Sequence, residues 1–193
     1  MRIIGGELAR RIIDLPKGLK LRPTTDIAKE ALFSAITSLQ AIEELRVLDL
    51  FAGTGSIGLE FLSRGASEVI FVEKLPRHAQ FIKQTVKTLG LHSRSRIVVT
   101  DALRFLQRGE GNGSFDIIFA DPPYDLPQIP EIPQLVFGSC LLARNGLLIL
   151  EHPGTIGFID QDPRCFKHKV YSAVNFSFFQ EEAHGRGYDR LET

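Results

Sequence analysis

The chain contains 193 residues, of which 44% are hydrophobic and 24% are charged, an ordinary mixture for one globular domain. Lys and Arg total 23, as do Asp and Glu, so the formal net charge is zero and nucleic acid could be bound only through a local basic patch. The sequence has no secretory segment and no apolar run that approaches the roughly 20 residues needed to span a bilayer, so we expect a soluble, cytoplasmic protein. We also expect it to be a monomer.

The two cysteines, Cys140 and Cys165, are too few for a disulfide framework and are not spaced as metal ligands. We therefore expect two buried thiols in a reducing compartment, and no metal site.

The first 22 residues form a basic segment that we expect to be a small N-terminal extension. Only two acids, Glu7 and Asp14, accompany six basic residues, which are Arg2, Arg10, Arg11, Lys17, Lys20 and Arg22. Glu7–Leu15 predicts one or two short strands and Pro16–Gly18 predicts a turn, so the extension is predicted to be a β-hairpin. Such a cluster is typical either of a solvated edge hairpin or of a surface that contacts RNA.

Residues 23–180 are predicted to form the main domain, in which strands and helices alternate. Pro23–Asp26 precedes a helix that runs to Leu39, with Thr25 or Asp26 as its N-cap. Short apolar runs predict buried strands at Val47–Leu50, Val69–Val72, Ile97–Val99, Phe115–Ala120 and Leu147–Leu150. Helices are predicted at Pro76–Leu89 and Ala102–Gln107. This alternation predicts an α/β fold with a doubly wound, Rossmann-like, mostly parallel sheet.

The end of the chain has a different pattern. Phe166–Tyr171 and Val174–Gln180 are strand-like with no helix between them, which predicts an antiparallel hairpin at the sheet edge. Residues 181–193 are polar and contain glycine, so we expect a mobile tail.

A glycine-rich loop follows the first predicted strand. Residues 53–58 match the pattern G-x-G-x-x-G, which by itself fits a tight turn, an NAD site or an S-adenosylmethionine site. Asp49 precedes the loop, and its carboxylate would repel a pyrophosphate but attract the ammonium and sulfonium groups of S-adenosylmethionine. We therefore predict that S-adenosylmethionine binds here, held by Asp49, Phe51, Ala52, Gly53, Thr54 and Gly55.

Two further acids follow the next two predicted strands. Glu73, with Lys74 beside it, lies about 20 residues past the loop, where a carboxylate can accept from both ribose hydroxyls. Asp101, followed by Ala102, can accept from the adenine amino group or cap the next helix, and both roles can coexist. Because ligands bind outside the carboxyl ends of parallel strands, all four residues are predicted to line the cofactor site.

The fourth predicted strand ends in Asp121-Pro122-Pro123-Tyr124, the most specific string in the chain. The prolines stiffen the turn and remove two N–H donors, so that it presents the Asp121 carboxylate and the Pro122 carbonyl as acceptors. An exocyclic amine on a base is a poor nucleophile, and two acceptors gripping its hydrogens would localise its lone pair and aim it at a methyl group. Tyr124 could stack on an unstacked base. We predict that these four residues form the catalytic site of an amino-methyltransferase.

Together these motifs resemble the RsmD-type methyltransferases, which act on N2 of a guanine in small-subunit (16S) ribosomal RNA. The resemblance runs from Arg2 almost to Phe179 and rests on Leu21–Asp26, Asp49–Gly55, Asp121–Tyr124 and Glu151-His152. It implies a seven-stranded class I methyltransferase fold with an antiparallel last strand, S-adenosylmethionine as cofactor and an assembling small ribosomal subunit as partner. It also implies that the N-terminal extension meets RNA, with candidate contacts at Arg2, Arg10, Arg11, Arg22 and Thr25. No role is predicted for Glu151-His152.

Other interpretations remain open. Another nucleic-acid amino-methyltransferase, acting on adenine N6 or guanine N2 of DNA or RNA, would use the same tetrad, although 193 residues leave little room for a DNA-recognition insertion. A protein glutamine methyltransferase usually has Asn in place of Asp121. An NAD(P) oxidoreductase would need catalytic residues that we do not find, and a non-catalytic RNA-binding module would not need an intact tetrad.

Overall fold

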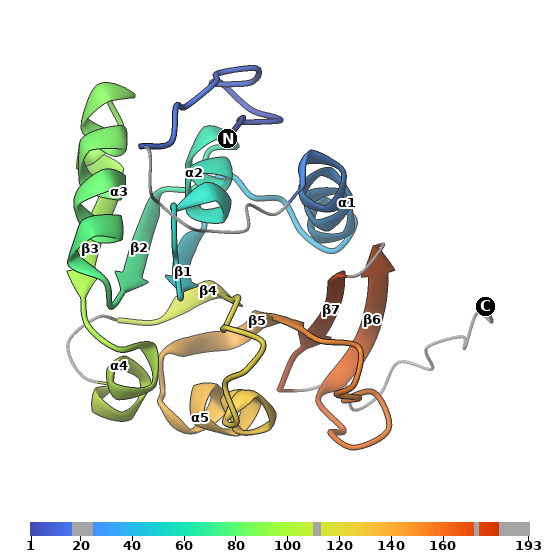
Figure 1. The fold of residues 1–193 in the computed structure, drawn as a ribbon. Coiled ribbons are helices and arrows are strands. Elements are labelled where there is room, and N and C mark those ends of the chain that lie inside the picture. The colour runs from blue at the N-terminus through green and yellow to red at the C-terminus, as the bar shows by residue number, and fades with distance from the viewer. Residues whose placement is uncertain (17–24, 110–112, 172–173, 182–193) are drawn as a thin grey trace.

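The structure is a computed structural model that describes residues 1–16, 25–109, 113–171 and 174–181 (Figure 1). Within these residues the chain forms a seven-stranded sheet in the order β3-β2-β1-β4-β5-β7-β6. The strands are β1 (Arg46–Leu50), β2 (Glu68–Glu73), β3 (Ser95–Val99), β4 (Phe115–Ala120), β5 (Leu142–His152), β6 (Cys165–Tyr171) and β7 (Val174–Phe179). Strands β1 to β5 are parallel, whereas β7 lies antiparallel between β5 and β6. The predicted doubly wound sheet with an antiparallel C-terminal hairpin is confirmed.

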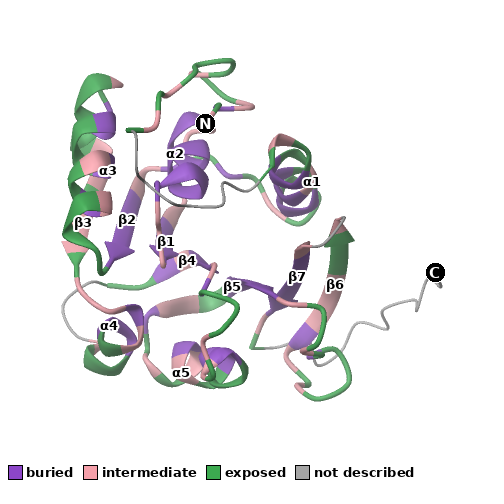
Figure 2. Cartoon of the chain, viewed as in Figure 1, coloured by how far each residue is buried: buried purple, intermediate pink, exposed green. Residues whose placement is uncertain are grey.

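Helices cover both faces of this sheet (Figure 1). On one face lie α1 (Asp26–Thr37), α2 (Ser56–Ser63) and α3 (Pro76–Thr88); on the other lie α4 (Ala102–Arg108) and α5 (Ile132–Gly138). Two short 3₁₀ turns, His92–Arg94 and Ile129–Glu131, lead into β3 and α5. Because side chains alternate along a strand, Val47 packs in the core with α1 to α3, and Leu48 packs in the core with α4 and α5. Both faces of the central strands are therefore buried, as Figure 2 shows in purple.

The strand order reverses direction between β1 and β4. After β1 the chain adds β2 and then β3 on one side, and it returns to place β4 on the other side of β1. In open α/β sheets, ligands bind outside the carboxyl ends of the strands at such a switch point. This reversal sets the glycine loop after β1 beside the turn after β4.

The N-terminal segment forms a hairpin, but not with the predicted arms. Residues 1–3 run antiparallel to residues 11–13, with a bridge between Arg2 and Ile12, and Glu7–Arg10 form the turn between them. The prediction of strands within Glu7–Leu15 was therefore wrong for most of that stretch. Gly6 makes the early reversal possible, because its φ of 76° is one that residues with a side chain rarely adopt. Residues 17–18 of the predicted turn lie outside the described residues.

The structure also differs from the expectation for one cysteine and contains one helix that was not predicted. Cys165 is buried as expected, but Cys140 is exposed, because it lies in the turn that precedes β5. Helix α5 was not predicted, since Pro130 and Pro133 interrupt the helical pattern around it. The tail lies outside the described residues from position 182 onward. Among the described helices, none is both long and apolar enough to cross a membrane.

Candidate functional site

Four acidic side chains lie at the carboxyl ends of neighbouring strands. They are Asp49 on β1, Glu73 on β2, Asp121 directly after β4 and Glu151 on β5. Each comes two residues after an apolar residue of the core that α1 to α3 cover, namely Val47, Phe71, Phe119 and Ile149. Since alternate residues of a strand share a face, the sheet gathers all four acids on that face.

The glycine loop between β1 and α2 uses backbone conformations that suit glycine. Gly53 and Gly55 have φ of 58° and 74°, and Phe51 has φ of 58° although it carries a side chain. The Ala52 N–H donates to the Val72 carbonyl at 3.0 Å. The Gly53 N–H donates to Glu73 Oε2 at 2.8 Å. These bonds hold the loop across the carboxyl ends of β1 and β2.

Asp49 is buried beneath this loop. The Gly58 N–H donates to its Oδ2 at 2.9 Å, and a side chain at position 58 would come within 2.2 Å of the Phe71 ring. Glycine at 58 therefore permits α2 to approach the carboxyl group closely. Burial raises the pKa of Asp49 to about 7, with the Gly58 hydrogen bond acting in the opposite direction.

Glu73 is buried at the end of β2, where both of its oxygens accept from backbone N–H groups. Besides Gly53, the Leu75 N–H donates to Oε1 at 2.7 Å. Lys74 is exposed, and Leu75 and Val99, which is paired with Glu73 across β2 and β3, are 46% and 55% exposed. An exposed aliphatic ledge therefore lies next to the Glu73 carboxylate. The sequence analysis did not identify this ledge, although two apolar residues at strand ends were its signal.

Asp101 acts as the N-cap of α4. Its Oδ1 accepts from the N–H groups of Leu103 at 3.0 Å and Arg104 at 3.2 Å, and Ala102 is buried as the first residue of the helix. Of the two roles that the sequence left open for Asp101, the structure contains the cap.

The tetrad after β4 forms a tight turn. The Asp121 N–H donates to the Leu50 carbonyl at 3.4 Å, which ties the turn to the end of β1. Asp121 is half-buried, Pro122 is buried, and Tyr124 is 42% exposed. The Tyr124 hydroxyl donates to Glu151 Oε1 at 3.0 Å. The turn thus bridges from the glycine-loop strand to β5.

Asp121 and Glu151 influence each other strongly. Ala120 is paired with Leu150, so the residues that follow, Asp121 and Glu151, are neighbours across β4 and β5. Burial raises the pKa of Asp121 well above its ordinary value, and the negative charges of Glu151 and Asp49 raise it further. Burial also raises the pKa of Glu151 to about 7, although the hydrogen bond from Tyr124 opposes this.

Glu151-His152 divides into two residues with different surroundings. His152 is fully buried, and its ring nitrogens lie 2.8 Å from Ser177 Oγ and 3.0 Å from the Pro153 carbonyl, so it ties β5 to β7. Glu151 instead joins the acids of the site. Its signal in the sequence is the one shared by Asp49, Glu73 and Asp121: an acid immediately at the end of an apolar strand.

The predicted RNA contacts divide into three groups. Arg10 and Arg11 are exposed in the N-terminal hairpin. Arg2 forms an ion pair with Asp26 at 2.7 Å, and Thr25 Oγ1 accepts from the Ala28 N–H at 3.2 Å as the N-cap of α1. Arg22 lies outside the described residues. The hairpin is therefore connected to the start of α1 through Arg2.

A buried carboxylate anchors the hairpin to α2. Glu60 accepts from the N–H groups of Ile4 at 2.9 Å and Gly5 at 2.7 Å, and it pairs with Arg64 and with the buried Lys29. Lys29 also donates to the Arg2 carbonyl and to Ser56 Oγ at the start of α2. The hairpin and the helix that follows the glycine loop thus share one polar network, which the sequence analysis did not identify.

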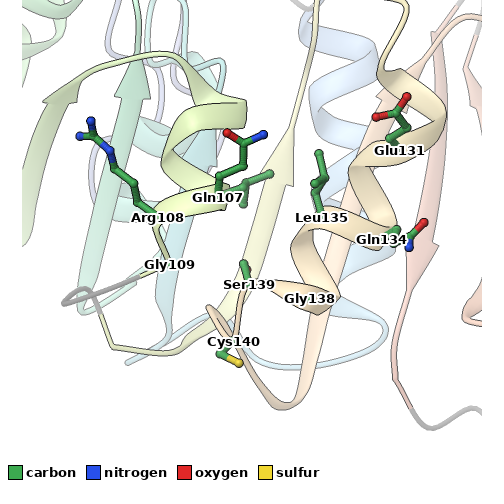
Figure 3. A pocket seen from close by; sticks show the side chains of 10 residues that line it. Gln107, Arg108, Gly109, Glu131, Gln134, Leu135, Gly138, Ser139 and Cys140 are labelled. Atoms are coloured by element: carbon green, nitrogen blue, oxygen red, sulfur yellow. The ribbon is translucent and has the colours of Figure 1, made fainter.

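Figure 3 shows a pocket of about 770 Å³ that lies elsewhere, between the C-terminal ends of α4 and α5. Its lining includes Arg108, Leu135 and Cys140. These residues lie near the starts of β4 and β5, at the opposite edge of the sheet from the four acids. None of the predicted site residues lines it.

Known proteins resemble this chain over nearly its whole length. The family model described as conserved hypothetical protein 95 matches residues 1–180. Ribosomal RNA small subunit methyltransferase D of Escherichia coli is 32% identical, covering 96% of this chain and 92% of its own. The protein of that name from Haemophilus influenzae is 33% identical over 93% of each chain. A solved structure of a hypothetical protein from Thermus thermophilus has a TM-score of 0.80 at 28% identity, covering 93% of this chain and 99% of its own.

The sheet topology and these relatives identify the chain as a class I methyltransferase that uses S-adenosylmethionine. Within that class, the chain belongs to the family described as conserved hypothetical protein 95, the RsmD family. The resemblance seen in the sequence is confirmed.

Proposed function

We propose that this methyltransferase transfers a methyl group to the exocyclic N2 of a guanine in small-subunit ribosomal RNA. The observation that carries the proposal is the position of the Asp121–Tyr124 turn, which is hydrogen-bonded to the end of β1 beside the glycine loop. The names of the relatives support ribosomal RNA as the substrate. We place the reaction in the cytoplasm, with a monomeric enzyme acting on an assembling small subunit.

The residues around the loop fit S-adenosylmethionine. Asp49 is a buried acid under a loop of glycines, so a cationic ammonium group there would supply the charge that favours its ionised form. Glu73 retains lone pairs for ribose hydroxyls, and the Leu75–Val99 ledge offers an apolar surface to the adenine ring. Phe51 to Gly55, Lys74, Asp101 and Ala102 complete the proposed site. When bound, the cofactor supplies an electrophilic methyl group.

The target base is held by the turn after β4. The Asp121 carboxyl and the Pro122 carbonyl accept the two hydrogens of the amine, which localises its lone pair and directs it toward the glycine loop. Tyr124 is exposed enough for its ring to stack on the base while its hydroxyl remains bound to Glu151. These groups position the amine for in-line attack.

The rest of the chain contributes RNA binding. We propose that residues 1–22 form an extension whose exposed Arg10 and Arg11 approach the RNA backbone, that residues 23–180 form the methyltransferase domain, and that residues 181–193 form a tail outside it. Arg2 and Thr25 act less directly, because Arg2 is paired with Asp26 and Thr25 caps α1.

The proposal is tested by mapping modified nucleosides in ribosomal RNA by mass spectrometry, with and without the enzyme. We expect one N2-methylguanosine to disappear from small-subunit RNA when the gene is deleted and to return with the wild-type chain. The Asp121→Ala variant should not restore it, although that variant should still bind S-adenosylmethionine. A lost modification in large-subunit RNA, in DNA or at adenine N6 would contradict the proposed target and favour another amino-methyltransferase.

A further inference from the structure

Glu151 has one oxygen that the fold leaves without a hydrogen-bond donor. The side chain is 6% exposed, and its Oε1 accepts from the Tyr124 hydroxyl at 3.0 Å. Its Oε2 is buried and accepts from no N–H or hydroxyl group among the residues that the structure describes. A buried acceptor without a donor is costly, so a proton on a neighbouring group would stabilise this oxygen.

The group beside it is another carboxyl. Register across β4 and β5 makes Asp121 the neighbour of Glu151, and the two carboxyl groups are close enough for the charge of Glu151 to raise the pKa of Asp121. Two ionised carboxylates are both acceptors and repel each other, whereas one proton on the pair removes the repulsion and supplies a donor for the unpaired Oε2.

We propose that Asp121 and Glu151 share one proton in the resting enzyme and together receive the proton that the methylated amine loses. The inference rests on the proposed function, because it assigns the target amine to the Asp121 turn. Glu151 is then a positioning residue that acts through Asp121 and does not touch the base.

Protons and electrons balance across this transfer. As the bond from the amine nitrogen to the methyl carbon forms, the sulfur–methyl bond breaks and its electron pair stays on sulfur, which leaves the nitrogen positively charged. An N–H bond then breaks, its electron pair stays on nitrogen, and the proton moves to the Asp121 oxygen that faces the amine. The proton on the other Asp121 oxygen moves to Glu151 Oε2. The pair goes from one proton to two and from one negative charge to none, and the extra proton returns to solvent through the half-buried Asp121.

The groups around the pair determine how readily it accepts that proton. Asp49 on β1 contributes a negative charge that raises the pKa of Asp121. Tyr124 donates to the ionised form of Glu151 and lowers the pKa of Glu151. On the side of β7, the residue in register with Glu151 is the uncharged Phe176, and His152 is bound to Ser177. Tyr124 is therefore the neighbour whose substitution should change the pKa of the pair.

The test measures single-turnover methyl transfer against pH for four proteins: wild type, Tyr124→Phe, Glu151→Gln and the double variant. Phenylalanine keeps the ring but loses the hydroxyl, so the pKa of Glu151 rises and the acidic limb of the profile should move up by about one pH unit. In the Glu151→Gln background the same change should not move the limb. If Tyr124→Phe shifts the acidic limb in neither background, or shifts it equally in both, the Tyr124 hydroxyl does not act on the carboxyl pair and the proposal is overturned.

A second measurement needs no RNA. Carbon-13 NMR of labelled carboxyl groups in the free enzyme should show Asp121 and Glu151 titrating as a coupled pair. In Glu151→Gln the pKa of Asp121 should fall by at least about one unit, because the negative neighbour has gone and an amide N–H can donate to the carboxylate. If the two carboxyl groups titrate independently at ordinary pKa values, the proposal of a shared proton is overturned, even if the enzyme methylates guanine. A coupled pair in an enzyme that methylates another target would instead overturn the proposed function alone.

Discussion

At the scale of single residues, Asp49 is the group whose charge should be most sensitive to pH in the proposed cofactor site. Burial raises its pKa to about 7, and only its ionised form attracts a cationic ligand. Below that pH the neutral form dominates and binding of S-adenosylmethionine must first remove a proton. The affinity should therefore fall by up to about tenfold for each pH unit below 7.

Isothermal titration calorimetry of S-adenosylmethionine between pH 5 and 7.5, in buffers of different ionisation enthalpy, checks this prediction by measuring affinity and proton release together. The Asp49→Asn variant should bind more weakly, with a smaller dependence on pH and with less proton release. Asp125→Asn, which alters an exposed carboxyl in the turn after the tetrad, is the matched control and should behave as the wild type. A wild-type affinity that stays constant over this range would mean that Asp49 does not face the cofactor's positive charge.

The sequence could identify those site residues whose role depends on local pattern. Asp49 and Asp121 each stand in a short motif at the end of a buried strand. The residues next to them in the sequence are therefore enough to identify them as site residues. Glu151 contributes to the family resemblance and ends an apolar strand, but neither feature predicts a role for it. Its importance comes from the neighbouring positions of β4 and β5, which depend on strand order and register across the sheet. The Glu60–Lys29 network is hidden for the same reason, because it joins three segments that are distant in sequence.

At the scale of elements, the start of α1 offers a test of a residue that was predicted to contact RNA. Thr25 has the extended backbone of an N-cap, with φ of −61° and ψ of 151°, and its hydroxyl accepts from the Ala28 N–H. Replacing Thr25 with Ala should lower the free energy of unfolding by about 1 kcal/mol, because one helix N–H loses its partner. Thr25→Ser keeps the acceptor and should lose much less.

Urea denaturation of the three proteins measures these differences. If Thr25→Ala is as stable as the wild type while RNA binding is weakened, the hydroxyl contacts RNA and contributes little to the stability of the helix.

Elements also differ in how well the sequence predicts them. The central strands are short apolar runs and α3 has a clear helical period, whereas the arms of the N-terminal hairpin are set by Gly6 and by contacts with α2 that no local pattern reveals.

At the scale of the whole molecule, a chain without net charge can bind RNA only where its basic residues are concentrated. The N-terminal hairpin exposes Arg10 and Arg11, and the Glu60 network holds it against α2, the helix that follows the glycine loop. The hairpin therefore occupies a fixed position relative to the glycine loop. Anchoring in this manner would let RNA bound by the hairpin present one base to the turn after β4.

This arrangement predicts that RNA affinity depends on these two arginines through phosphate contacts. Replacing both with Gln should reduce the slope of log affinity against log salt concentration by about 1.5, since each lost phosphate contact contributes roughly 0.7 to 0.9. The matched control replaces Arg104 and Arg108, two exposed arginines on α4 at the other face of the sheet (Figure 1), and should leave the slope unchanged. Equal slopes for all three proteins would mean that the hairpin only covers α2 and that RNA approaches the strand ends from another direction.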